Sequence, residues 1–115
     1  MGLQRNEGSE RIAITAVKPS LDAAVDPRFG RCAYFVMVDV ETGDMEAVKN
    51  TSPVSGGHAG VESAETIASK GATVLLTGRC GSNASDALSR RGIQVVSGCS
   101  GTVREVVKQY KEKGQ

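Results

Sequence analysis

The sequence GATVLLTGRCGS at residues 71–82 is repeated in outline as GIQVVSGCSG at residues 92–101, and this repeat indicates the fold class. In both copies an apolar strand pattern runs into a turn that places one cysteine between glycines, and a helix pattern follows. The first turn of such a helix presents unpaired backbone N–H groups and the positive end of the helix dipole. Two of these turns side by side suit a small anionic or metal-containing ligand.

The apolar pattern predicts the other elements of the domain. Strands are expected at residues 12–17, 34–40, 45–49, 73–77 and 93–97. Helices are expected around residues 61–68, over 82–91 and from Thr102, which forms a capping-box pattern with Glu105. Segment 18–32 contains Pro19 and Pro27 and is expected to be irregular.

The order of the strands follows from the lengths of their connections. The turn at residues 41–44 makes the second and third strands an antiparallel hairpin. The first and fourth strands are the most continuously apolar, so we place them at the centre of the sheet. Right-handed crossovers then put the fourth and fifth strands on the far side of the first. The sequence therefore predicts an α/β domain with a five-stranded mixed sheet of order 3-2-1-4-5, strand 2 antiparallel, and helices on its faces.

Length and composition are those of one globular domain. The chain has 115 residues, 39% hydrophobic and 23% charged, and we expect a mobile tail at residues 1–10 and a single domain over 11–115. The formal net charge of +1 argues against nucleic-acid or membrane-surface binding, and no stretch resembles a membrane span or a secretory signal. Three cysteines without dense spacing indicate reduced thiols and a cytoplasmic protein.

The reactive residues gather at one edge of the predicted sheet, where the parallel strands end; we call it the carboxyl edge. Loops 18–32, 50–60, 78–82 and 98–101 all reach it, and open α/β sheets bind ligands where the connections diverge at such an edge. The candidate metal ligands are the thiols and the imidazole on these loops: Cys32, His58, Cys80 and Cys99. Alternatively, the thiols only pack in the turns and His58 is an ordinary loop residue.

Charge at the carboxyl edge favours an anion. Arg28, Arg31 and Arg79 oppose Asp22 and Asp26, and the helix dipoles add to the positive side. Each arginine taken singly fits a solvated loop residue better, and only the three together near helix N-termini indicate an anion site. A helix N-terminus also lowers the pKa of a thiol, so Cys80 and Cys99 are expected to be partly ionised. The central strands lack paired carboxylates, and no third group orients a Cys–His pair, so we expect no enzyme activity.

Three ordered motifs carry a family resemblance. DPRFGR at residues 26–31 precedes the strand at Tyr34 and the turn ETG at 41–43, TGRCGSNA follows at 77–84, and GCSGTV with Glu105 ends the pattern at 98–105. From residue 11 to about residue 110 the chain resembles the dinitrogenase iron–molybdenum cofactor biosynthesis family, which includes nitrogenase accessory factor-like and orange-protein-like members.

The resemblance implies a three-layer α/β/α, ribonuclease H-like fold without nuclease activity. It also implies a carrier or chaperone for an anionic metal–sulfur cluster that contains iron, molybdenum or copper, with a client metalloenzyme or cluster-assembly protein as partner. Many members have histidine where this chain has Arg28, which can pair with an anion but cannot coordinate a metal. The residues expected to contact the cluster are Arg28, Phe29, Gly30, Arg31, Gly78, Arg79, Gly81, Ser82, Gly98, Ser100 and Gly101.

Two other functions use the same residues. The glycine-rich turns also suit a nucleotide- or phosphate-binding regulatory module. The cysteines at the helix N-termini also suit a thiol redox sensor.

Overall fold

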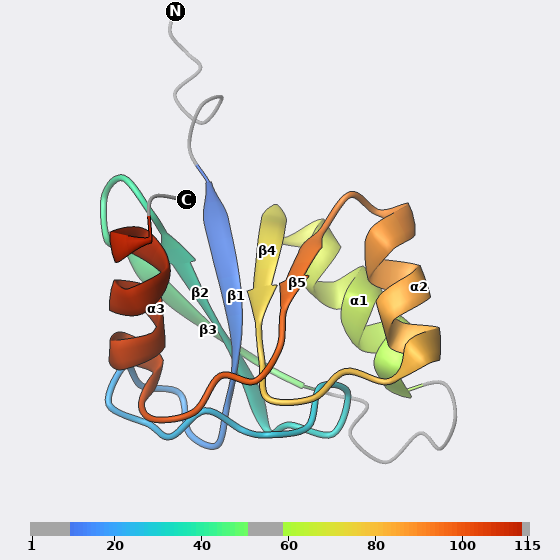
Figure 1. Ribbon diagram of the computed structural model, residues 1–115, viewed down its shortest axis with the longest axis horizontal. Helices are drawn as coiled ribbons and strands as arrows, with labels where there is room; N and C mark the ends of the chain where they lie inside the picture. Colours follow the sequence, from blue (N-terminus) through green and yellow to red (C-terminus); the bar gives the residue numbers. More distant parts are fainter. Residues whose placement is uncertain (1–9, 51–58, 114–115) are drawn as a thin grey trace, which may run out of the picture.

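The computed structural model describes residues 10–50 and 59–113 as a layered α/β domain (Figure 1). Its elements follow the order β1 (Arg11–Ala16), β2 (Tyr34–Asp39), β3 (Met45–Lys49), α1 (Ala59–Ser69), β4 (Ala72–Leu76), α2 (Ser82–Arg90), β5 (Gln94–Val96) and α3 (Val103–Glu112). None of the helices in these two ranges is long and apolar enough to span a membrane.

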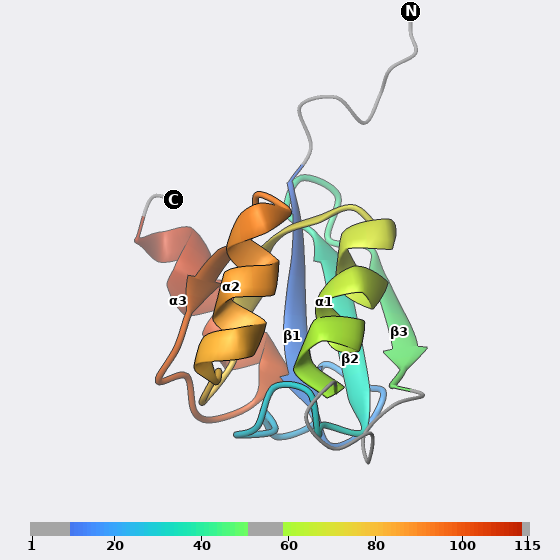
Figure 2. The ribbon, with the colours of Figure 1, turned by 90° about the vertical axis from the view of Figure 1, so that its right-hand side faces the viewer.

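The sheet has the predicted topology. Its strand order is β3-β2-β1-β4-β5, β2 is antiparallel to both of its neighbours, and β1, β4 and β5 are parallel. Figures 1 and 2 show α3 on one face and α1 with α2 on the other, which confirms the three-layer architecture. The parallel strands therefore all end at the carboxyl edge, as the sequence predicted.

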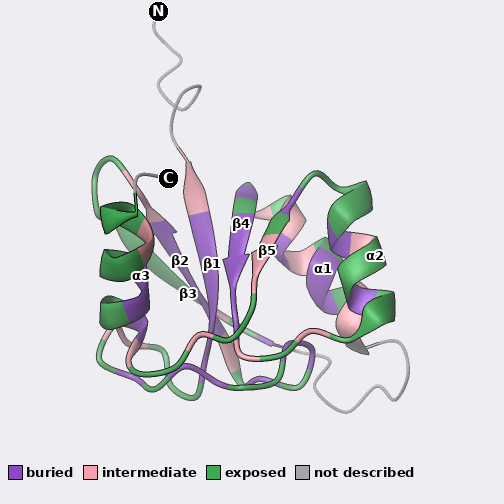
Figure 3. Ribbon diagram, viewed as in Figure 1, coloured by how far each residue is buried: buried purple, intermediate pink, exposed green. Residues whose placement is uncertain are grey.

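Strand β1 separates two hydrophobic cores and is almost entirely buried. Ile12 and Ile14 belong to the core under α3, whereas Ala13 belongs to the core under α1 and α2. In Figure 3, the central strands and the sides of the helices that face the sheet have the colour of buried residues. This is the pattern expected for a sheet covered on both faces, where alternate side chains enter opposite layers.

Several predicted boundaries differ by a residue or two. Val17 is 40% exposed and donates its N–H to the carbonyl of Ala24, so β1 ends before it. Ile93 donates its N–H to the Leu88 carbonyl at 2.9 Å and thus closes the end of α2, which leaves β5 with three residues. Glu10, which we assigned to the tail, accepts a hydrogen bond from the Val40 N–H at 2.9 Å. Residues 1–9 lie outside the described residues, so the mobile tail stays a prediction.

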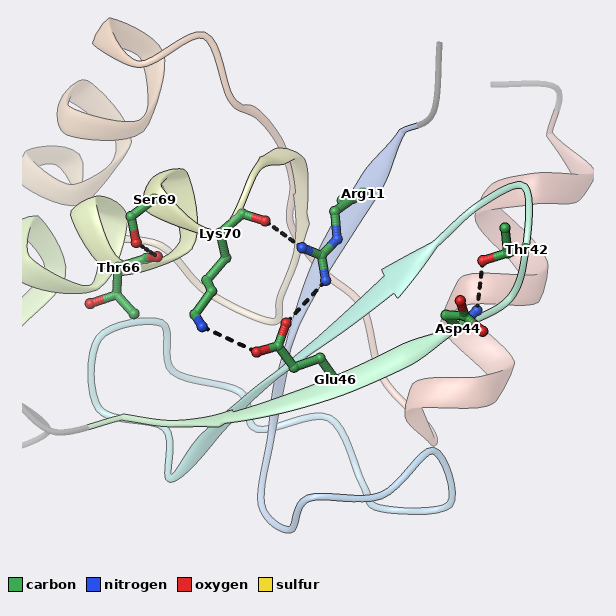
Figure 4. Close-up of polar contacts among 7 residues, drawn as sticks. All are labelled: Arg11, Thr42, Asp44, Glu46, Thr66, Ser69 and Lys70. Carbon is green, nitrogen blue, oxygen red and sulfur yellow. Dashed lines mark hydrogen bonds and ion pairs between the residues drawn. The ribbon is translucent and has the colours of Figure 1, made fainter. Parts of the chain in front are cut away.

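The edge of the sheet opposite the carboxyl edge is tied together by one charged network (Figure 4). The Arg11 guanidinium donates to the Lys70 carbonyl at 2.6 Å and to the Glu46 carboxylate at 3.3 Å, and the Lys70 ammonium donates to Glu46 at 3.1 Å. This network joins the edge strand β3 to β1 and to the end of α1. The hydrogen bonds from Lys70 and Arg11 lower the pKa of Glu46.

The network predicts a small, pH-dependent loss of stability in Glu46→Gln. A carboxylate with a lowered pKa in the folded state stabilises the protein above its unfolded-state pKa, and this stability is lost as pH falls through the folded-state pKa. These side chains are substantially exposed, so each ion pair contributes little. Near neutral pH we expect the substitution to lower the free energy of unfolding by less than about 1 kcal/mol.

Urea unfolding across the acid range measures this difference, which should begin to shrink near the usual glutamate pKa of 4.5 and vanish only below the lowered folded-state pKa of Glu46. Glu41→Gln is the matched control, because Glu41 is exposed and has no ion pair within residues 10–50 and 59–113. A difference that persists unchanged at low pH would contradict the assignment.

Candidate functional site

The long loop between β1 and β2 closes over the carboxyl edge. Along it, Val25 bridges back to Ala16, Ala24 bridges to Thr102 at the start of α3, and Arg28 bridges to Arg79 after β4. The loop runs below the ends of the strands in Figure 1. It therefore connects the two turns that the repeated sequence unit forms.

The bridge between Arg28 and Arg79 brings two of the predicted site residues together. The Arg79 N–H donates to the Pro27 carbonyl at 2.7 Å, and the Phe29 N–H donates to the Arg79 carbonyl at 3.0 Å. Residues paired in a ladder present their side chains to the same face, and both arginines are exposed. We call them the arginine pair. Two neighbouring guanidinium groups favour an anion with several acceptor atoms.

Gly78 permits this arrangement because it lacks a side chain. A Cβ atom at Gly78 would lie 2.7 Å from the Pro27 Cα and 2.9 Å from the Pro27 carbonyl oxygen. Both are backbone atoms, so a methyl group would push the two loops apart. Gly78 was predicted as a ligand contact, and the structure gives it a steric role in holding Arg79 beside Arg28.

A buried polar cluster joins the loop to the ends of the central strands. The Thr15 hydroxyl donates to the Asp26 carbonyl at 2.7 Å and lies 3.0 Å from the Thr77 hydroxyl, and both threonines are fully buried. Sequence reasoning missed these two residues. Their signal is a polar residue at the end of an otherwise apolar strand pattern, which at that position implies a buried partner.

Asn50 performs a similar task on the other side of the loop and was also missed. It is 4% exposed, and its side-chain amide donates to the carbonyls of Gly30 at 3.1 Å and Cys32 at 2.9 Å. Phe29, predicted as a cluster contact, is 7% exposed and packs against Phe35 at a ring-centroid distance of 6.0 Å. These contacts anchor the loop from which Arg28 and the exposed Arg31 project.

The N-terminus of α3 is closed by the protein itself. The predicted capping box is present, with the Glu105 N–H donating to the Thr102 hydroxyl at 3.1 Å and the Thr102 N–H donating to the Glu105 carboxylate at 3.0 Å. The next N–H groups, of Val103 and Arg104, donate to carbonyls of the β1–β2 loop. These donors of the α3 N-terminus are therefore occupied, contrary to the expectation that this turn serves a ligand.

The N–H groups of the turn before α3 also form hydrogen bonds within the protein. The N–H groups of Gly98 and Cys99 donate to the carbonyls of Gly78 and Thr77 at 2.9 and 3.0 Å. With Ser100 they line a groove of about 390 Å³ between β5 and α3. The expectation that the N–H groups of Gly98 and Cys99 are free for an anion is therefore wrong, because they hold the two turns together.

The N-terminus of α2 differs, and it follows directly on the arginine pair. Its N-cap residue is Gly81, and no side chain among the described residues caps it. The first turn contains no acidic residue, and both Gly81 and Ser82 are exposed. Within residues 10–50 and 59–113 no acceptor pairs with the first N–H groups of α2, so these groups and the helix dipole add to the positive charge of the arginine pair.

The three cysteines do not form one ligand set. Cys32 is fully buried in the core under α1 and α2, Cys80 packs against that same core, and Cys99 packs against the core on the opposite face of the sheet. Within residues 10–50 and 59–113, no group of three or more Cys, His, Asp or Glu side chains is placed to hold a metal ion. His58 lies outside the described residues.

The predicted ionisation of the thiols is wrong in direction. Burial, with a contribution from the Asp26 carboxylate, raises the pKa of Cys32 to about 12. Burial also raises the pKa of Cys80 and of Cys99. Burial disfavours the charged thiolate relative to the neutral thiol at these two positions.

Comparison with known proteins agrees with the fold and the motifs. The family described as dinitrogenase iron-molybdenum cofactor matches residues 10–113. The apo form of the orange protein from Desulfovibrio gigas is 44% identical, with a TM-score of 0.88 over 90% of this chain and 88% of that one. A putative NifB protein from Thermotoga is 34% identical, with a TM-score of 0.79 over 90% and 88%.

An uncharacterized protein of Methanocaldococcus jannaschii is 29% identical over 76% of this chain and 77% of its own length. The fold and the loops at the carboxyl edge define a small α/β domain in which two exposed arginines are paired beyond the end of β4. The chain belongs to the dinitrogenase iron–molybdenum cofactor family.

The close approach at Gly78 predicts losses of stability of different size for two glycines of one motif. Gly78→Ala should lower the free energy of unfolding by about 1–3 kcal/mol, because the new methyl group clashes with backbone. Gly81→Ala should cost less than about 1 kcal/mol, because its Cβ meets nothing within 4 Å and its φ of −68° suits any residue. Urea unfolding compares the two, and equal losses would contradict the steric role of Gly78.

Burial predicts slow thiol chemistry in the folded protein. At about pH 8 we expect Cys32 to react with Ellman's reagent only after unfolding, and Cys80 and Cys99 to react more slowly than a free thiol, because their pKa values are raised. Mass spectrometry of the labelled protein, with a guanidinium-denatured sample as control, identifies each site. Rapid native labelling of Cys32 would show that it is accessible.

Proposed function

We propose that this protein is a carrier for an anionic metal–sulfur cluster, bound at the arginine pair and the N-terminus of α2. The observation that supports this most directly is the backbone pairing of residues 27–29 with Arg79, which joins two exposed arginines, the second of them two residues before Gly81, an N-cap that no side chain of the described residues caps. Sulfides and other acceptor atoms of such a cluster would receive charge-assisted hydrogen bonds there. The family match, and likeness to the orange protein and to the putative NifB protein, support a role in cofactor assembly.

In this proposal the cluster is held by charge and hydrogen bonds and not by thiolates. Cys32 is fully buried. Cys80 and Cys99 pack against opposite faces of the sheet, so these two thiols do not enclose one site between them. Arg28 supplies charge where it cannot supply coordination. Iron, molybdenum or copper in the cargo would thus be recognised through the atoms around the metal.

The proposal further includes a cytoplasmic location, a client metalloenzyme or cluster-assembly protein, and release of the cargo without chemical change. Arg31, exposed on the same loop, would extend the positive surface. A nucleotide- or phosphate-binding function would use the same surface, so the binding experiment must distinguish the two. A thiol redox sensor is less well supported, because burial raises the pKa of all three cysteines.

Tetrathiomolybdate, a coloured molybdenum–sulfur dianion, is a suitable probe for this site. We expect the wild type to retain it on anaerobic dialysis, and Arg28→Met or Arg79→Met to weaken binding about 10- to 100-fold, as for loss of one charge-assisted hydrogen bond. Absorbance and titration calorimetry measure the affinity. Arg90→Met, at the far end of α2, is the control with the same loss of charge.

If Arg90→Met weakens tetrathiomolybdate binding equally, the effect is due to net charge alone, and the assignment of the site to Arg28 and Arg79 is wrong. Failure of the wild type to retain the probe would contradict the carrier function. Tighter binding of inorganic phosphate or ATP than of tetrathiomolybdate would favour the regulatory module.

A further inference from the structure

We propose that the carboxylate of Asp26 is an internal competitor for Arg28, which limits the affinity of the site and keeps its anionic cargo exchangeable. The inference rests on the proposed carrier function and concerns the control of cargo release at that same site. Asp26 is 5% exposed and precedes Arg28 by two residues in the same loop, with its Oδ1 3.8 Å from the Arg28 Nε.

The carboxylate is fixed in place by its own backbone. The Asp26 N–H donates to the Thr15 carbonyl at 2.9 Å, and the Asp26 carbonyl accepts from the Thr15 hydroxyl at 2.7 Å. The side-chain oxygen Oδ1 accepts from the Arg28 N–H at 3.1 Å, which forms a local turn. Two of these hydrogen bonds hold the backbone of Asp26, and the third holds its carboxylate beside Arg28.

Arg28 is shared between this carboxylate and the solvent. Its Nε lies 3.8 Å from the Asp26 Oδ1, while its side chain is 63% exposed, against 8% for the side chain of Asp26. The exposed part of the guanidinium is free to meet a ligand, but its charge is already partly balanced. Because the carboxylate is buried, water screens it less than it screens a surface charge.

An anion at the arginine pair therefore meets two positive charges with a fixed negative charge behind one of them. Among the described residues, the ion pair between Asp26 and Arg28 is the one that involves the arginine pair. A carrier must give up its cargo, and a permanent internal carboxylate lowers the affinity without requiring any conformational change. The binding energy that this repulsion removes is the quantity that the experiment measures.

A purely structural role for Asp26 makes a different prediction. If the carboxylate only accepted the hydrogen bond from Arg28 N–H, asparagine would replace it with no change in anion affinity. If it positioned the Arg28 guanidinium productively, asparagine would weaken binding. Only internal competition predicts that removal of the charge tightens binding.

Asp26→Asn tests the inference, because the asparagine oxygen still accepts from the Arg28 N–H while the charge is lost. We expect the variant to bind tetrathiomolybdate about three- to tenfold more tightly than the wild type, with a slower dissociation rate and a difference that shrinks at high salt. Stopped-flow absorbance and calorimetry measure both quantities. Asp26→Ser, whose hydroxyl also accepts this bond, is the second variant where asparagine impairs folding.

Asp22→Asn is the matched control, with the same change of charge in the same loop. Its carboxylate is 79% exposed and pairs with Arg104 at 3.1 Å, away from the arginine pair. We expect less than a twofold change in affinity there, since an exposed charge is screened.

Unchanged or weaker binding in the folded Asp26 variants would overturn internal competition, and so would an equal gain in Asp22→Asn. These outcomes differ from failure of the carrier function itself. If Arg79→Met weakens binding and Asp26→Asn does not tighten it, the site stands and the competition is refuted. If the wild type does not bind the probe at all, both proposals fall.

Discussion

The candidate site depends on a short parallel pairing of two loops across the carboxyl edge. Residues 27–29 pair with Arg79 through hydrogen bonds of 2.7 and 3.0 Å, and the missing side chain of Gly78 lets the two backbones approach. The pairing joins the β1–β2 loop to the turn that follows β4. It converts two arginines that are distant in sequence into neighbours, and every argument about anion binding depends on that adjacency.

The two turns of the repeated unit have taken on different tasks because their sequences differ at the helix cap. Thr102 and Glu105 close the start of α3, and its next N–H groups reach into the β1–β2 loop, so this helix end fastens the loop that carries Arg28. Gly81 offers α2 no such cap. One helix end is thus a structural clamp, and the other retains the donors that an anion could use.

Much of the fold could be predicted from local patterns, and much of the site could not. Apolar strands, a hairpin turn and the capping box each act over a few residues, so their consequences could be derived from the sequence. The burial of Cys32 depends instead on the path of a long loop and on Asn50, 18 residues away, which holds its carbonyl. Thr15 and Thr77, 62 residues apart, likewise form a pair only in the folded sheet. For the thiols, burial raises the pKa, and the extent of burial depends on packing against distant elements that the local motif does not contain.

A site made of charge rather than coordination has a consequence for delivery. A metal–thiolate bond must be broken by ligand exchange, whereas hydrogen bonds from guanidinium and backbone N–H groups exchange readily with water and with another protein's donors. With Arg28 and Arg79 exposed at the edge of the sheet, a client could approach the cargo while it is still bound. In the proposed carrier, the buried Asp26 carboxylate, which pairs with Arg28, would oppose the cargo from the start. In such a carrier, a limited affinity for the cargo would itself favour its transfer to the client.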